Sequence, residues 1–135
     1  MNTTNTPEMI FYQKLGELFY AIAASDKVVR KAEYKALAEL VEKEWKQLDD
    51  YEDAFKTDAA YQIAIVFDWF DYEQMDAQDC FDSFCDYYKE HTHSFSPKRK
   101  ELILITARKI ANAFNGTNKN ELIVLSRLEL LFKGS

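Results

Sequence analysis

The sequence has few residues that interrupt helices and few that build metal or catalytic centres. Its 135 residues include 3 glycines and 2 prolines, so long helices are allowed. It has 2 cysteines and 2 histidines, too few at chelating spacing for a zinc site. Glycine-rich phosphate loops, zinc-protease helices and nucleophile elbows are also absent. These absences argue against an enzyme.

Long apolar runs are missing too, and so is an excess of positive charge. No run approaches the length of a membrane span, which predicts a cytoplasmic protein without membrane insertion. The net charge of −6 argues against nucleic-acid binding, which needs a basic footprint to release counterions. The acids concentrate in residues 49–90, with 13 acidic and 2 basic side chains, against 10 and 15 elsewhere. This imbalance indicates internal charge pairing or a face that attracts cations.

Hydrophobic residues make up 47% of the chain, enough for a core without a disulfide or metal. Apolar positions recur at helical spacing and no segment reads as a strand. We therefore expect an all-α fold: a flexible arm over 1–7, then one compact, bundle-like domain of about six helices over 8–135. The expected helices cover about 7–24, 30–48, 57 or 58 onward, 76–90, 97–114 and 118–132. The fifth, with its apolar run over 102–105, should be the most buried.

Start signals support several of these boundaries. Asp76 is a suitable N-cap, and Ser96 followed by Pro97 is a cap with proline at the first helical position. Asn118 with Glu121 three residues later forms a capping box.

Two helix–turn–helix corners stand out, over 18–33 and 107–121, each with acids near a helix start. The string AIAASDKVVRKAEYKAL, residues 21–37, resembles the signature of the TerB-like tellurite-resistance domain family. The matching positions are Ala23, Ala24, Asp26, Val29 and Glu33, and Asn115, Gly116 and Glu121 match the repeat of the pattern in part. The resemblance implies a pseudo-duplicated helical domain with helix pairs at its two ends. It also implies a role in tellurite or stress resistance, and divalent-cation binding through the acidic positions.

The resulting site prediction is a weak divalent-cation site, for example for calcium, at Asp26, Glu33, Asn115 and Glu121. Calcium takes about six to eight oxygen ligands, and each turn offers only part of such a shell. Lys27 replaces the usual glycine and Asn115 the usual aspartate, which weakens the site further. The alternative is structural, because the same side chains can accept backbone N–H groups at the starts of helices.

The acidic middle segment offers further candidates. The aspartates of 76–86 are expected to form a solvated face, and His91 and His93 to be exposed rather than to share a metal. Five tyrosines of this segment suit either a protein-binding face or a half-buried core: Tyr51, Tyr61, Tyr72, Tyr87 and Tyr88.

Two functions follow from these observations. The first is a non-enzymatic TerB-like binding module with a weak metal site. The second is a protein–protein adaptor that keeps the fold without the metal. The adaptor hypothesis predicts a contiguous exposed aromatic patch in the acidic middle.

Overall fold

The computed structural model describes residues 7–24, 43, 53–115 and 119–134, with side chains described over 9–24, 43, 62–112 and 122–134. It confirms the all-α prediction: over these residues the chain forms α-helices, one short 3-10 helix and no strand. The elements are α1 (Pro7–Ala23), α3 (Asp53–Glu73), α4 (Ala77–Glu90), η2 (Thr92–Ser94), α5 (Pro97–Asn115) and α6 (Lys119–Lys133). The helix expected over 30–48, which would complete the first predicted pair, lies outside the described residues.

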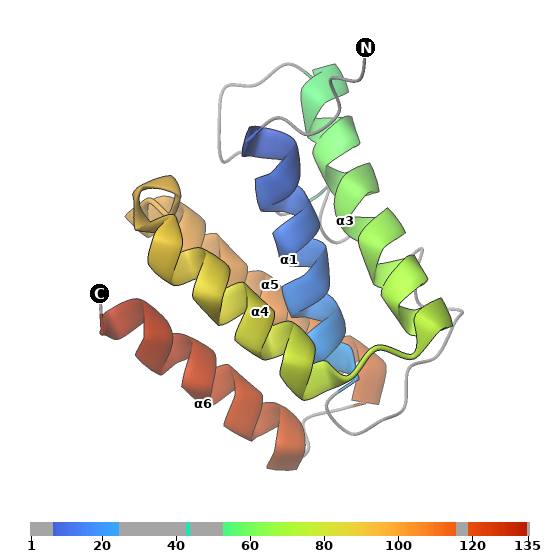
Figure 1. The fold of residues 1–135 in the computed structure, drawn as a ribbon, viewed down its shortest axis with the longest axis vertical. Helices are drawn as coiled ribbons and strands as arrows, with labels where there is room; N and C mark the ends of the chain where they lie inside the picture. Colours follow the sequence, from blue (N-terminus) through green and yellow to red (C-terminus); the bar gives the residue numbers. More distant parts are fainter. Residues whose placement is uncertain (1–6, 25–42, 44–52, 116–118, 135) are drawn as a thin grey trace.

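Helix α1 is the centre of the fold. It packs against α3, α4, α5 and α6, and in Figure 1 it stands between α3 on one side and α4 and α5 on the other. Helix α6 lies at the edge opposite α3 (Figure 1). Every residue from Leu15 to Ala24 is buried, whereas Leu102, Leu104 and Ile105 of α5 are only partly covered. The prediction that the fifth helix is the most buried is therefore wrong.

Two charged side chains of α1, Lys14 and Glu17, make this helix look partly exposed when only the sequence is considered. Lys14 Nζ lies 3.0 Å from Glu17 Oε1, and it donates a hydrogen bond of 2.9 Å to Ser83 Oγ on α4. Pairing makes it possible to bury most of the Glu17 side chain, which is only 11% exposed. From Leu15 onward α1 is thus buried on every side, although it carries the charged Glu17.

The structure confirms the predicted N-caps of two helices, α4 and α5. The Asp76 carboxylate accepts the N–H of Asp79 at 2.9 Å, and the Ser96 hydroxyl accepts the N–H of Arg99 at 3.2 Å. The prediction of a start at residue 57 or 58 is wrong, because α3 already begins at Asp53. Residues 53–56 contain no glycine or proline, and an aspartate in the first turn suits the helix dipole, so nothing there stops the helix.

The end of α3 is held by a Schellman motif, in which a residue in the left-handed region closes the helix. Gln74 takes this position with φ of 55°, although glycine is the usual residue there. The N–H of Gln74 donates to the carbonyl of Asp71, and the N–H of Met75 donates to that of Phe70. Tyr20 of α1 adds a tether, since its hydroxyl donates to the Met75 carbonyl at 2.8 Å.

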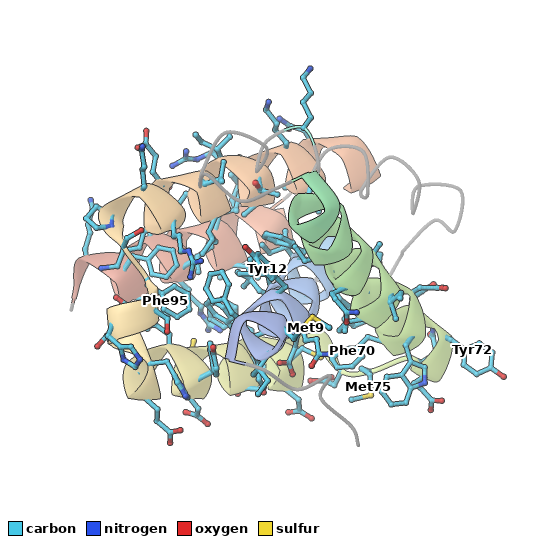
Figure 2. All side chains as sticks on the ribbon, turned by 90° about the horizontal axis from the view of Figure 1, so that it is seen from above. Met9, Tyr12, Phe70, Tyr72, Met75 and Phe95 are labelled. Atoms are coloured by element: carbon cyan, nitrogen blue, oxygen red, sulfur yellow. The ribbon has the colours of Figure 1, made fainter. Side chains whose placement is uncertain are left out.

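Phe95, directly after η2, is the hub of an aromatic cluster between the helices (Figure 2). Its buried ring contacts the rings of Phe11, Phe84, Tyr87, Tyr88 and Phe132. The segment 91–95, expected as a plain loop, therefore supplies a core residue that joins α1, α4 and α6.

Helices α1 and α3 are in close contact at Gly16. A Cβ on this glycine would lie 2.7 Å from the Ile63 carbonyl oxygen and 2.9 Å from the Val66 Cβ. The absence of a side chain therefore sets the spacing between the two helices. None of the helices in the described residues combines the length and apolar character needed to cross a membrane.

Candidate functional site

The predicted cation site cannot be assembled from the described side chains. Asp26 and Glu33 lie outside the described residues. Asn115 is the last residue of α5 and Glu121 lies in the first turn of α6, but their side chains are also outside the described set. Among the described residues, no three His, Cys, Asp or Glu side chains are grouped to hold a metal ion. The four-residue site stays a prediction.

The aspartates of α4 form the solvated face that the sequence predicts. Asp76, Asp79, Asp82 and Asp86 are all exposed. Asp76 caps the helix, and Asp82 accepts a hydrogen bond of 2.9 Å from the amide of Gln78. This face is a source of negative potential on α4.

The two histidines differ from each other. His93 is exposed, as expected, but His91 is half-buried. The His91 ring stacks on Tyr87 with centroids 4.2 Å apart, and its Nδ1 lies 3.0 Å from the Tyr87 carbonyl oxygen. His91 therefore serves the end of α4, because a proton on Nδ1 donates to one of the carbonyls left open there.

Both cysteines are free thiols. Burial is the main cause that raises the pKa of Cys80 to about 12, with the Glu17 carboxylate adding to it. Burial also raises the pKa of the half-buried Cys85 thiol. Because the thiolate is the nucleophile, neither group has the character of a reactive cysteine at neutral pH.

The tyrosines of the acidic middle divide between the two alternatives. Tyr87 and Tyr88 are buried in the aromatic cluster, whereas Tyr72 is 77% exposed. Tyr51 lies outside the described residues, and the side chain of Tyr61 is not described either. The structure thus places one of the predicted interface tyrosines at the surface, at the far end of α3 (Figure 2).

Tyr72 belongs to a larger apolar surface that the tyrosine count alone did not reveal. Ile65 and Trp69 of α3 are exposed as well, Trp69 to 59%, and so is Met75 directly after the helix. Positions 65, 69 and 72 are spaced i, i+4 and i+7, which places them on one face of a helix. We call these four residues, together with the flanking Asp68 and Glu73, the α3 outer face.

The acids of this face border the apolar stripe on both sides. At about 100° per residue, Asp68 lies about 60° from Ile65 in one direction and Glu73 about 80° in the other. Both acidic residues are exposed. An apolar stripe between two carboxylates can bury apolar side chains of a partner and attract its cations at the rim.

The α3 outer face is built on a well-anchored helix. Ile63 and Phe67 on the opposite side are fully buried, and the close contact at Gly16 fixes the helix against α1. The tether from Tyr20 to Met75 holds the end that carries Tyr72. Such anchoring presents the exposed side chains in a fixed arrangement, which lowers the entropic cost of binding.

The sequence contains a signal for this face. Residues 60–72 carry two apolar stripes, one formed by 60, 63, 64, 67 and 70 and another by 65, 69 and 72. The first stripe includes Ile63 and Phe67, which are fully buried. The second stripe, read by itself, predicts an additional apolar surface on the same helix.

Comparisons with protein-family models, with curated proteins and with solved structures gave no match to this chain.

Proposed function

We propose that this chain is a non-enzymatic protein-binding module that docks a cationic, amphipathic helix on the α3 outer face. The observation that carries this proposal is the exposure of Ile65, Trp69 and Tyr72 on one side of α3, with Met75 exposed directly after the helix. Single exposed apolar residues are ordinary, but a contiguous group with two aromatic side chains is typical of an interaction site. Trp and Tyr are also the residues that most often dominate binding energy at interfaces.

The charge of the surroundings supports the cationic partner. Residues 61–90 carry eight acidic side chains and one basic side chain, and seven of the acids are exposed. An amphipathic helix with Leu or Ile anchors and flanking Lys or Arg matches both the stripe and its rim. Steering by this acidic field would increase the rate of encounter with such a helix.

The relationship to TerB-like domains, with a role in tellurite or stress resistance, is part of the proposal and rests on the sequence of residues 21–37. A cytoplasmic location is also part of it, and the two unbridged cysteines fit a reducing compartment. Weak divalent-cation binding at Asp26 and Glu33 is the second candidate. Titrating the full chain with calcium and following its melting temperature tests it, with Asp26→Ala as the control.

A peptide-binding measurement tests the α3 outer face. A fluorescently labelled 15-residue helical peptide of Leu and Lys is titrated with the full chain, and its anisotropy is followed. We expect Trp69→Ala to weaken binding about tenfold or more, because a buried interface tryptophan is typically worth over about 1.4 kcal/mol. His93→Ala is the control, since His93 is also an exposed ring but lies in η2 rather than on α3; it should bind as the wild type does.

Two results would reject this function. One is a wild-type chain that does not bind the peptide at about 1 mM, the weakest affinity of interest. The other is equal loss of binding in Trp69→Ala and His93→Ala, which would show that the α3 outer face has no special role.

A further inference from the structure

A second exposed apolar stripe runs along α6, the helix at the opposite edge of the molecule. Ile123 and Leu130 are seven residues apart and lie within about 20° of each other around the helix. Both are exposed, Leu130 to 68%, and so is the neighbouring Leu122. These residues have no role in the core, which α6 contacts through other positions such as Leu128 and Phe132.

Cations border this second stripe. Arg127 and Lys133 lie about 60° from Leu130, one on each side, and both are exposed. The one acid with a described side chain on this helix, Glu129, is engaged by Arg108 of α5 at 2.6 Å. We call Leu122, Ile123 and Leu130 with Arg127 and Lys133 the α6 outer face.

The α6 outer face has the chemistry of the partner that the α3 outer face requires. One is an apolar stripe between two acids, and the other is an apolar stripe between two cations. The same contrast extends to the surrounding helices, since residues 53–90 carry ten acidic and two basic side chains and residues 97–133 carry three and eight. The two faces are thus complementary in polarity and in charge.

The two faces cannot meet within one molecule. Helices α3 and α6 lie at opposite edges of the fold with α1 and α4 between them (Figure 1). They are also not among the helix pairs that share an extended contact in the described residues. A contact between these faces therefore has to join two molecules.

We propose that the occupant of the α3 outer face is the α6 outer face of a second copy of this chain. This inference rests on the proposed function of the α3 outer face and names its partner. The contact is heterologous, because each molecule uses a different surface from its neighbour. An open assembly of any size therefore has one unoccupied α3 outer face at one end and one unoccupied α6 outer face at the other. Further copies can add at both ends unless the copies close into a ring.

The first test is the molar mass of the full chain by light scattering and by sedimentation, over about 5 μM to 1 mM, the range of weak interfaces. We expect a mass of 15.8 kDa at the lowest concentration and a rise beyond that of a dimer at the highest. Added salt should reduce the rise, because exposed charges at the rim are screened. A chain that stays monomeric over the whole range overturns the inference.

A charge exchange then identifies the two faces. Asp68→Lys with Glu73→Lys makes both faces basic, and Arg127→Glu with Lys133→Glu makes both acidic. Each double variant alone should stay monomeric, because like charges now meet at the contact. An equimolar mixture should associate again, because each variant offers the face that the other lacks. Damage to folding cannot produce such a rescue on mixing, and circular dichroism of each variant verifies the helix content.

The remaining outcomes separate the inference from the proposed function. Association that persists in both double variants, or no rescue on mixing, overturns the pairing of these two faces. If the wild-type chain is monomeric but still binds the Leu and Lys peptide through Trp69, the self-association is wrong and the binding module stands. If it is monomeric and fails to bind the peptide, both are wrong.

Discussion

Gly16 of α1 lies so close to Val66 of α3 that a Cβ on the glycine would stand 2.9 Å from the Cβ of Val66 and 2.7 Å from the carbonyl oxygen of Ile63. A glycine inside a helix normally weakens it by about 0.5 to 1 kcal/mol relative to alanine. At Gly16 the short distance between the two helices outweighs the preference of a helix for alanine. The atom nearest to an added Cβ is a backbone oxygen, which cannot rotate away from it.

Gly16→Ala should therefore destabilise the protein by about 1 to 3 kcal/mol, the usual cost of forcing atoms into a packed core. Urea unfolding followed by circular dichroism measures the change. Gly134→Ala is the matched control, since its Cβ would approach only to 3.3 Å of the Leu130 carbonyl oxygen at the end of α6. It should change stability by less than about 0.5 kcal/mol. A Gly16→Ala protein as stable as the control would contradict the packing of α1 on α3.

Gln74 offers a change in the opposite direction. Its left-handed backbone costs a residue with a side chain about 1 kcal/mol more than glycine. Gln74→Gly removes this cost but loses the side-chain hydrogen bond from Gln74 Nε2 to the Asp71 carbonyl oxygen at 2.7 Å. We expect a net gain in stability of about 0.5 kcal/mol, since the lost hydrogen bond offsets only part of the relief, and the Asp71 carbonyl keeps the backbone N–H of residue 74 as a donor.

Gln74→Val completes that comparison. A β-branched residue is strongly disfavoured at positive φ, so this variant should lose more than about 1 kcal/mol. The pair of unfolding curves tests the Schellman ending of α3. Gly and Val variants of equal stability would mean that the left-handed position is absent.

The burial of the Tyr20 phenol makes stability sensitive to alkaline pH. Burial, with Asp71 as the next cause, raises the pKa of Tyr20 from 10.0 to about 12. The folded state therefore favours the neutral phenol, and this stabilisation is complete below about pH 10 and lost as the pH rises to about 12. The pKa of Cys80, also raised to about 12, adds a loss of the same sign that begins near pH 9.

Tyr20→Phe should cost about 0.5 to 1.5 kcal/mol at pH 7, because the Met75 carbonyl loses its donor. Between about pH 10 and 12 the difference from the wild type should shrink, since the variant has no phenol to ionise. Urea midpoints at a series of pH values give both quantities. Tyr72→Phe, at an exposed position, should follow the wild type throughout. A constant difference for Tyr20→Phe across this range would show that the phenol is not buried in the way described.

Phe95 tests the aromatic cluster. Phe95→Ala should destabilise the chain by about 3 to 5 kcal/mol, because it opens a cavity among five surrounding rings. Phe95→Leu should lose less, since it keeps most of the volume. Thermal unfolding followed at 222 nm ranks the two. A Phe95→Ala loss below about 1 kcal/mol would remove Phe95 from the core.

The sequence was sufficient for the features that depend on neighbouring residues. Asp76, Ser96 and Pro97 act within a few residues of their own positions, so the starts of α4 and α5 could be predicted. It was insufficient where burial depends on a distant partner. Glu17 reads as a surface residue until Lys14, held by Ser83, is placed beside it, and Phe95 reads as part of a loop until rings from three helices surround it.

The candidate site shows the same division. For the tyrosines of the acidic middle the sequence left a protein-binding face and a half-buried core both open, and the structure exposes Tyr72 but buries Tyr87 and Tyr88. Tyr72 and Tyr88 could not be told apart from sequence, because each lies on an amphipathic helix and only packing decides which face turns inward. The predicted cation ligands fall where side chains are not described, so their test belongs to metal titration.

The central position of α1 has a consequence for how the chain folds. Its contacts with α5 and α6 join residues separated by about 80 to 120 positions in the sequence, and within the described residues α3, α4 and α5 each make their most extensive helix contact with it. To form such distant contacts the chain first has to lose the entropy of closing a long loop, and only then do the contacts stabilise the folded state. Refolding should therefore be slower than the high helix content suggests, and rates from stopped-flow mixing should resemble those of mixed α/β domains rather than simple up-and-down bundles.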